Sequence, residues 1–211
     1  MRLLLLRHGA TDWNLQGRCQ GATDLELNET GIRQAQEIAA HLSGQSIRAI
    51  YSSDLKRAVQ TAYFIGQPHG LEVAIEASLR ELDHGALEGL TFAEIRAGFP
   101  DFIEQWRDRP AEAPVPGGER LIEVDARAWD GVNHIVRRHK PEETLVIVSH
   151  NFPILAILCR ITDTPLNSYR TFHLDPCGIS TVSYHPAAGW AVVQVNGGAG
   201  GRAEHQPNRN R

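Results

Sequence analysis

The chain has 211 residues, of which 42% are hydrophobic and 22% are charged, as in an ordinary globular protein with one large domain. A net charge of -4 argues against nucleic acid or an anionic membrane as the main partner, so any anion site must be a local cluster of basic groups. Three cysteines without a CxxC pair indicate free thiols, and no apolar run is long enough for a signal peptide or a membrane span; we therefore expect a cytoplasmic protein.

Strand-like apolar runs alternate with helical spacing along most of the chain. In order, the predicted elements are strand 2–6, helix 28–42, strand 47–53, helix 54–66, strand 71–77, helix 124–139, strand 144–150, helix 153–161, and strands 180–185 and 190–195. Asn28 or Thr30 can cap the first of these helices, and Ser53 or Asp54 the second. This alternation predicts a three-layer α/β/α fold with a mostly parallel sheet.

The segment 85–119 interrupts this alternation, because it is rich in proline and ends in Gly117-Gly118. We interpret it as an excursion from one α/β domain that spans 1–197, with a short helix at 91–98 and then a loop that covers a site. Trp106 can anchor the excursion by packing. The tail at 198–211 has almost no apolar residues and is predicted to be disordered.

Five chemistry-bearing side chains follow the predicted strands at one end of the sheet: Arg7, His8, Arg57, Glu81 and His150. Ligands of parallel α/β sheets gather at the carboxyl ends of the strands. Two guanidinium forks suit the oxygens of a phosphate, and the N-terminus of the helix that carries Arg57 adds backbone donors. Arginines disfavour protonation of a nearby imidazole, so a neutral His8 can attack phosphorus and form a phosphohistidine.

The remaining members of this set have complementary roles in phosphoryl transfer. His150 can donate to the equatorial oxygens, where charge is stabilised in the transition state. Glu81 is the candidate acid that protonates a leaving alcohol and then the base that acts on water. Asp83 and Glu88 lie close by in the sequence, and either remains an alternative proton donor.

Six blocks, in order along the chain, resemble the histidine phosphatase (phosphoglycerate mutase-like) superfamily. They are Arg7-His8-Gly9 with Thr11 and Asn14, then 17–21, 50–62, 79–89, 116–119 and 148–151. The resemblance implies a phosphoglycerate mutase-like fold, a phosphorylated His8, phosphoryl binding by Arg7, Arg57 and His150, and acid/base catalysis by Glu81. It implies that Asn14 and Gln20 line the pocket, and that the site holds no metal and needs no cofactor.

The compact chain and its LRELDHG segment look like the phosphatase branch of this superfamily. The segment, together with SHNFPILAILC, resembles the metal-independent phosphoserine phosphatases, in which a histidine at the position of His84 is implied to contact the amino acid part of the substrate. The alternatives are a phosphoglycerate mutase, or a phosphatase for a sugar phosphate, a phosphoglycerate derivative or α-ribazole phosphate. A phosphate-binding module and a metal-dependent hydrolase are the other classes considered.

Two positions depart from the pattern of the superfamily. Leu87 stands where many relatives have tryptophan, and Arg120 where serine is common, and we expect both near the pocket mouth. Structural roles compete with functional ones elsewhere: His84 can be bonded to backbone, and Asn14 and Gln20 can stabilise turns. The expected partner is a small phosphomonoester, and the closing strands or an exposed sheet edge could support a homodimer.

Overall fold

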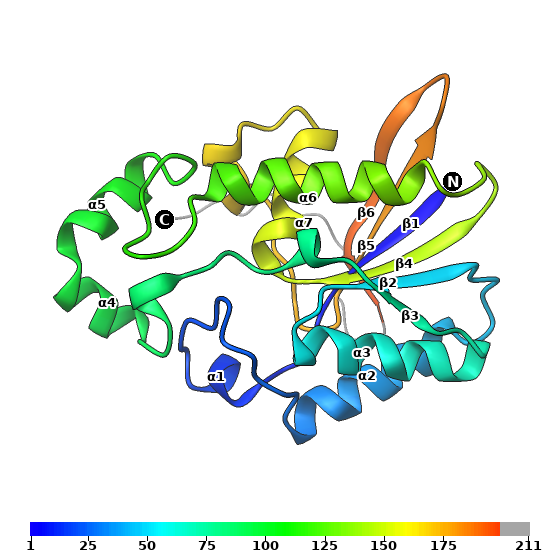
Figure 1. Cartoon of the computed structure of the whole chain (residues 1–211), viewed down its shortest axis with the longest axis horizontal. Coiled ribbons are helices and arrows are strands. Elements are labelled where there is room, and N and C mark those ends of the chain that lie inside the picture. Colours follow the sequence, from blue (N-terminus) through cyan, green and yellow to red (C-terminus); the bar gives the residue numbers. More distant parts are fainter. Residues whose placement is uncertain (199–211) are drawn as a thin grey trace.

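A six-stranded sheet lies at the centre of the structure, a computed structural model that describes residues 1–198 (Figure 1). Its strands are β1 (Arg2–Arg7), β2 (Ala49–Ser52), β3 (Val73–Ile75), β4 (Thr144–Ser149), β5 (Ile179–His185) and β6 (Gly189–Gly197). The strand order is β3-β2-β4-β1-β5-β6, in which the first four strands pair in parallel, whereas the pairs β1–β5 and β5–β6 are antiparallel. The predicted mostly parallel sheet is confirmed, whereas the tail predicted at 198–211 lies, apart from its first residue, outside the described residues.

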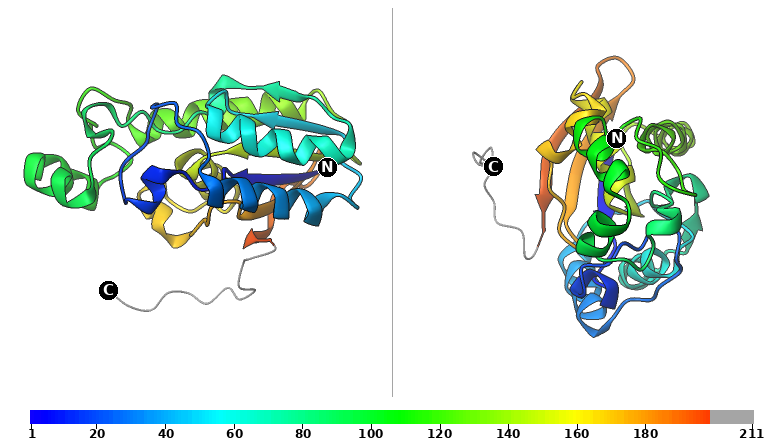
Figure 2. Two further views of the ribbon diagram at one scale, coloured as in Figure 1. Left: turned by 90° about the horizontal axis from the view of Figure 1, so that it is seen from below. Right: turned by 90° about the vertical axis from the view of Figure 1, so that its left-hand side faces the viewer.

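Helices cover both faces of the sheet. The described helices are α1 (Asp12–Leu15), α2 (Glu29–Leu42), α3 (Lys56–Gly66), α4 (Phe92–Gly98), α5 (Pro100–Asp108), α6 (Leu121–Val136) and α7 (Asn151–Ile161). Short 3-10 segments lie at Gln67–His69, Ala77–Leu79, Gly85–Leu87 and Leu166–Thr171. Helices α2 and α3 lie on one face of the sheet and α6 and α7 on the other, which confirms the three-layer fold (Figure 2).

The leucine run of β1 connects the two halves of the core. Leu3 and Leu5 pack on the side of α6 and α7, and Leu4 and Leu6 pack on the side of α2 and α3. All four side chains are at most 1% exposed, because both faces of this strand are covered. The strand predicted over 2–6 is therefore confirmed, and its continuous apolar run corresponds to burial on both faces.

Two of the differences between the predicted and the observed helices have a local cause. The helix predicted over 124–139 is α6, which begins and ends three residues earlier; at its start, the Glu123 carboxylate accepts the N–H of Arg120, the residue before Leu121. In the excursion, the loop predicted after α4 contains a second helix, α5. Pro100 stands in its first turn, where proline is tolerated, so this residue starts a helix rather than breaking one.

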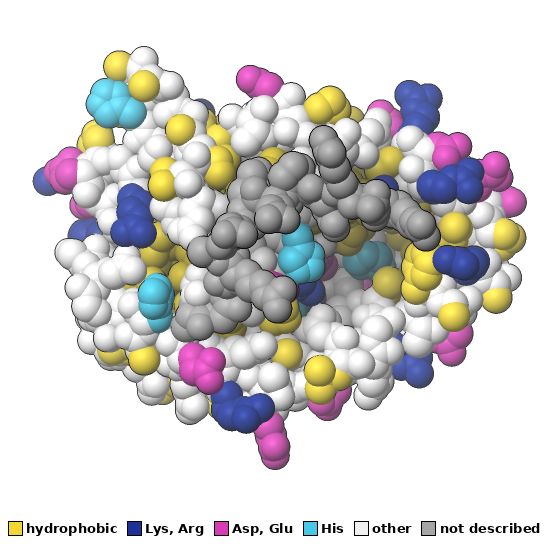
Figure 3. Space-filling model, turned by 180° about the vertical axis from the view of Figure 1, so that it is seen from behind, with side chains coloured by type: hydrophobic (Ala, Val, Ile, Leu, Met, Phe, Trp, Pro, Cys, Tyr) yellow, Lys and Arg dark blue, Asp and Glu magenta, His cyan; other side chains and the backbone are white. Residues whose placement is uncertain are grey.

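The surface of the described residues has no single dominant charge on the face shown in Figure 3. Outside the part that grey atoms cover, basic and acidic side chains are interspersed around this face. Among residues 1–198, no helix combines the length and apolar character needed to cross a membrane.

Candidate active site

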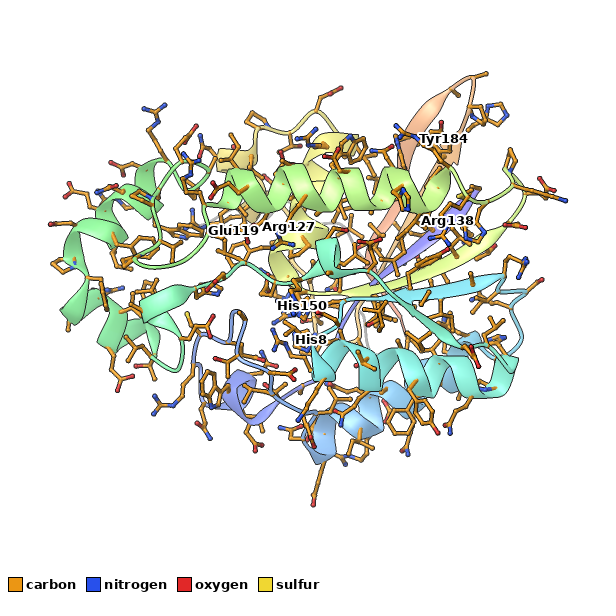
Figure 4. The ribbon with its side chains drawn as sticks, viewed as in Figure 1. His8, Glu119, Arg127, Arg138, His150 and Tyr184 are labelled. Carbon is orange, nitrogen blue, oxygen red and sulfur yellow. The ribbon has the colours of Figure 1, made fainter. Side chains whose placement is uncertain are left out.

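Two histidines from adjacent strands lie side by side at the carboxyl edge of the sheet. His8 follows β1 and His150 follows β4, and their ring centroids are 5.1 Å apart (Figure 4). The two strands pair in parallel with Arg7 opposite Ser149, so they end at the same level. On the other side of β4, β2 leads into α3, which carries Arg57. The strand order thus brings distant segments together, as the rule on strand ends predicts.

The carbonyl of the next residue, Gly9, fixes His8 in one tautomer. Its N–H donates to the carbonyl of Ser149 at 3.0 Å, and its ring Nδ1 lies 2.7 Å from the carbonyl oxygen of Gly9. A carbonyl oxygen only accepts, so Nδ1 carries the ring proton and Nε2 keeps a lone pair. This tautomer, in a side chain that is 2% exposed, leaves Nε2 as the nucleophilic atom.

The turn after His8 packs directly on the start of α2. A Cβ added to Gly9 would lie 2.7 Å from the carbonyl oxygen of Gly31, and a Cβ added to Gly31 would overlap the carbonyl oxygen of Ala10. Both positions therefore have to be bare backbone for the helix to approach this closely.

Both imidazoles are held neutral by their surroundings. Burial, followed by the positive charges of Arg57 and Arg7, holds the pKa of His8 well below its ordinary value. Burial and then Arg57, with a smaller effect of His8, also hold the pKa of His150 well below its ordinary value. A neutral His8 is the form in which the ring can attack an electrophile.

These low pKa values make the stability of the fold depend on pH. Below about pH 6.5 the unfolded chain protonates both imidazoles, whereas the folded protein keeps them neutral and binds fewer protons. The free energy of unfolding is therefore expected to fall as the pH decreases from about 6.5 towards 5, by up to about 1.4 kcal/mol per pH unit for each histidine. Urea unfolding across this range measures the effect.

The contribution of one histidine can be isolated by substitution. The two imidazoles together contribute to the slope of the free energy of unfolding against pH. His8→Gln is expected to remove about half of that joint contribution. His185→Gln, at an exposed position, is the control for the removal of an imidazole outside the site. An undiminished slope in the His8 variant would count against a neutral His8 in the folded state.

The two arginines of the site donate to backbone carbonyls, and each keeps one buried donor that has no partner within the described residues. Arg57 is 0% exposed, and its Nη1 and Nη2 donate to the carbonyls of Thr23 and Gly21, each at 2.7 Å. Arg7 donates through Nη1 to Leu174 at 2.6 Å. The Nε of each guanidinium is buried and has no partner within the described residues. These donors are available to an anion such as a phosphoryl group.

The N-terminus of α3, in contrast, is closed to an anion. The N–H of Lys56 donates to the Asp24 carboxylate at 2.7 Å, and the N–H of Arg57 donates to the carbonyl of Leu25 at 3.1 Å. The N-cap residue is Leu55, whose side chain makes no cap hydrogen bond. The prediction that this helix end adds backbone donors to the site is therefore wrong, because the preceding loop already uses them.

Ser53 and Asp54, the predicted caps of that helix, have other partners. The Ser53 hydroxyl lies 2.8 Å from Nε2 of His150 and accepts the N–H of Leu55 at 3.3 Å, so its proton can point to the imidazole. Asp54 accepts two hydrogen bonds of 2.6 Å from Arg80. Nδ1 of His150 then carries the ring proton, and it is buried without a partner in the part of the chain described. This N–H is a donor that a substrate oxygen can use.

The Glu81 carboxylate lies at the N-terminus of α7. Oε1 accepts the N–H groups of Phe152 at 3.1 Å and Leu82 at 2.9 Å, and Oε2 accepts the N–H of Asn151 at 3.1 Å. Oε2 therefore has one bond fewer than Oε1. The residue is 9% exposed and its charge acts on both Arg7 and Arg57, so the carboxylate belongs to the same site.

The two alternative proton donors are engaged elsewhere. Glu88 accepts the N–H groups of Ala22 at 2.6 Å and Thr23 at 2.9 Å, together with the Thr23 hydroxyl. It thus holds the loop whose carbonyls bind Arg57. Asp83 accepts the N–H of Gly85 at 2.8 Å. Glu81 differs from both because its charge acts on Arg7 as well as on Arg57, which favours it as the acid/base group.

Asn14 and Gln20 differ in how their side chains are used. The amide oxygen of Asn14 accepts from the backbone N–H of Thr11 at 3.0 Å and from its hydroxyl at 3.1 Å, and so completes a capping box on α1. The interpretation that Asn14 stabilises a turn is therefore correct for its oxygen. Gln20 is 8% exposed, and its buried Oε1 finds no partner in residues 1–198. That oxygen is free to accept from a substrate.

His84 belongs to an aromatic wall beside the site. Its partly buried ring lies 5.6 Å from Phe152, which packs edge-on against Trp106 at 5.7 Å. Burial lowers the pKa of His84, although the nearby Glu81 opposes this shift. Trp106 also donates to the Tyr169 hydroxyl at 3.2 Å, so it anchors the excursion as predicted.

The two positions that depart from the superfamily pattern are not equivalent. Leu87 is 1% exposed and packs in the core, so the expectation that it lies at a pocket mouth is wrong. Arg120 is exposed and donates to Glu123 at 3.0 Å from the start of α6. It contributes to the helix cap.

Sequence reasoning missed the pair of Arg127 and Glu119, which lies behind Glu81. Arg127 donates to the Glu119 carboxylate through Nε at 2.7 Å and Nη2 at 2.8 Å (Figure 4). The sequence signal was available: Arg127 is spaced three and four residues from Val124 and Gly131, which lie on the buried stripe of α6. A charged residue at such a position needs partners.

Known proteins match nearly the whole chain. The family model for the histidine phosphatase superfamily (branch 1) covers residues 3–197. Phosphoserine phosphatase 1 of Hydrogenobacter thermophilus is 34% identical over 182 residues, 86% of each chain, and a probable phosphoglycerate mutase GpmB of Proteus mirabilis is 32% identical over 196 residues, 91% of each chain. The structure of a mycobacterial glucosyl-3-phosphoglycerate phosphatase complexed with VO3 has a TM-score of 0.84 at 33% identity and covers 92% of this chain and 98% of its own. The resemblance drawn from sequence motifs is confirmed.

Proposed function

Because this chain belongs to branch 1 of the histidine phosphatase superfamily and is a phosphatase, we propose that it hydrolyses small phosphomonoesters through a phosphohistidine at His8, without a metal. The observation that carries the proposal is the neutral imidazole of His8, with Nδ1 bonded to Gly9 and two arginines beside it that keep buried donors unused. Phosphoserine is the leading candidate substrate.

In the first step, Nε2 of His8 attacks phosphorus as the bond from phosphorus to the ester oxygen breaks. Arg7, Arg57 and Nδ1–H of His150 donate to the three equatorial oxygens, where negative charge has to be stabilised. Protonated Glu81 gives its proton to the leaving oxygen, so the products of this step are a free alcohol and a phosphohistidine.

In the second step, water attacks the phosphohistidine. The Glu81 carboxylate takes a proton from that water, a bond from oxygen to phosphorus forms, and the bond from Nε2 to phosphorus breaks. Inorganic phosphate leaves, Nε2 of His8 regains its lone pair, and Glu81 is again protonated. The protons and electron pairs balance over the two steps, and no further reactant is needed.

Two observations support phosphoserine. A relative that is 34% identical is named phosphoserine phosphatase 1, and His84 lies beside the site with Nδ1 buried and no partner among the described residues. Other relatives are named as a probable phosphoglycerate mutase and a glucosyl-3-phosphoglycerate phosphatase, so both activities are alternatives that the experiment has to include. Sugar phosphates and α-ribazole phosphate belong in it as well. The cytoplasmic location and the homodimer stay predictions.

A phosphomonoester panel with a chelator present tests the proposal. We expect phosphate release from several small esters, with the highest kcat/KM for phosphoserine, at a rate that the chelator leaves unchanged. Isomerised 3-phosphoglycerate without phosphate release would favour the mutase, and activity that is lost with the chelator and restored by a metal would contradict metal-independent hydrolysis. Binding of phosphoserine without turnover of any ester would favour a binding module.

His84→Ala tests the substrate assignment. Loss of one hydrogen bond to the serine part is expected to lower kcat/KM for phosphoserine by about 3- to 10-fold. The same variant should hydrolyse p-nitrophenyl phosphate at nearly the wild-type rate, because this ester offers no amino acid group. An exposed histidine, changed in His185→Ala, is the control, and an unchanged preference among substrates in His84→Ala would end the assignment.

A further inference from the structure

One guanidinium binds the backbone of the whole segment that leads to Glu81. Arg127 donates through Nη1 to the carbonyls of Ser78 at 2.8 Å and Arg80 at 2.6 Å, and through Nη2 to the carbonyl of Glu81 at 2.9 Å. Its remaining bonds go to Glu119, so that every nitrogen of the fork is engaged. Three carbonyls of one segment therefore converge on a single side chain.

The segment also packs directly on the helix that carries this arginine. Gly131, one turn after Arg127 on α6, has no side chain at the point of contact, where a Cβ would overlap the Ser78 hydroxyl. From the other side, the N-terminus of α7 binds the Glu81 carboxylate through Asn151 and Phe152. Glu81 is thus held at its backbone by α6 and at its carboxylate by α7.

We propose that Arg127, anchored by Glu119, is a positioning residue that sets the Glu81 carboxylate at the distance required for proton transfer to the leaving oxygen. The proposal rests on the acid/base role of Glu81 in the proposed function. Arg127 acts on the substrate only through Glu81, because its own donors bind backbone carbonyls and Glu119. Its five N–H donors in a fixed fork suit the task, because they bind several carbonyls and a carboxylate at once.

The expected loss on removing Arg127 follows from geometry. A misplacement of about 1 Å in a reacting group can cost about 100-fold in rate. The loss should concern only reactions that need the proton of Glu81. Alkyl phosphates have poor leaving groups that need this proton, whereas aryl phosphates need little.

The experiment compares Arg127→Met with the wild type by kcat/KM for phosphoserine and for p-nitrophenyl phosphate, because kcat/KM reports the steps up to formation of the phosphohistidine. We expect a loss of about 30- to 100-fold on phosphoserine and less than about 3-fold on the aryl ester. Glu119→Gln, which keeps the packing and weakens the anchor, should show the same selectivity to a smaller extent. Arg127→Lys, which lacks the fork, should recover only a minor part of the activity.

Arg160→Met is the matched control. Arg160 on α7 also forms a two-bond ion pair with a carboxylate, Asp125 at 2.8 and 2.7 Å, but it does not bind the segment that precedes Glu81. This variant should change neither activity. A double-mutant cycle completes the design: in a Glu81→Gln background, Arg127→Met should cause little further loss on phosphoserine.

The outcomes separate the two proposals. Equal losses of Arg127→Met on both esters, or full additivity with Glu81→Gln, would overturn the positioning role and leave only a structural one. If Glu81→Gln itself shows no dependence on the leaving group, the acid/base assignment in the proposed function fails instead. Should Arg127→Met not fold, Glu119→Gln answers the same question.

Discussion

His8→Ala is expected to reduce the turnover of every phosphomonoester by about 10⁴-fold or more while leaving the fold intact. The variant removes Nε2, the atom that we propose forms the bond to phosphorus, and water in its place is not held in position to attack. The strand before His8 is held by the parallel register with β4 through backbone bonds, which the substitution keeps. Phosphate release gives the rate, and thermal unfolding reports the fold.

A trapping measurement makes this expectation specific. Wild-type protein quenched during turnover of a labelled ester should carry a phosphoryl group that is lost in acid and kept in alkali, as a phosphohistidine is, and His8→Ala should carry none. His139→Ala removes another partly buried imidazole, one bonded to Tyr51 and Glu143, and should keep both the label and the activity. Label or full turnover in His8→Ala would overturn the nucleophile assignment.

Glu81→Gln is expected to divide substrates by their leaving groups. General acid catalysis contributes about 10²- to 10⁴-fold, so kcat/KM for alkyl phosphates should fall within that range, whereas aryl phosphates should lose little. Glutamine keeps the length of the side chain and one acceptor oxygen, so it loses one of the two bonds from the N–H groups of α7 together with the transferable proton. Rates on esters that differ only in the leaving alcohol measure the effect.

The neighbouring carboxylates provide the controls. Glu88→Gln weakens the loop that holds Arg57, so its losses should be similar on alkyl and aryl esters. Asp83→Asn should stay close to the wild type, because this side chain only accepts a local N–H. Equal losses of Glu81→Gln on both kinds of ester, or a dependence on the leaving group in Glu88→Gln, would move the proton donor to another residue.

Most of the sheet could be predicted from the sequence because its strands are short, continuous apolar runs. The continuous apolar sequences of β1 and β4 indicate strands that are buried on both faces. Because ligand-binding residues follow the carboxyl ends of parallel strands, His8 and His150 could then be placed together. The start of α3 could not be predicted in the same way. Its donors are bound by Asp24 and Leu25 from a loop distant in the chain, and no spacing rule connects such residues.

The same limit applies to the residues that hold the site. Arg127 binds main-chain carbonyls, and Glu88 binds mainly main-chain N–H groups. Because every residue type offers these groups, the sequence does not indicate which residues are bound. Motif reasoning finds side chains whose type is dictated by chemistry. It is less able to find those whose role is to fix backbone, because their partners can be any residue.

The close approach of the turn after His8 to α2 constrains how this sequence can vary. A methyl group at Gly9 or at Gly31 would meet main chain, which has no rotamer to change, so the helix would have to move away. Such a shift would displace the imidazole before it unfolded the domain, giving a well-folded but inactive protein. A mutational library built on this chain should therefore keep the two positions fixed together, although only one of them belongs to the RHG motif.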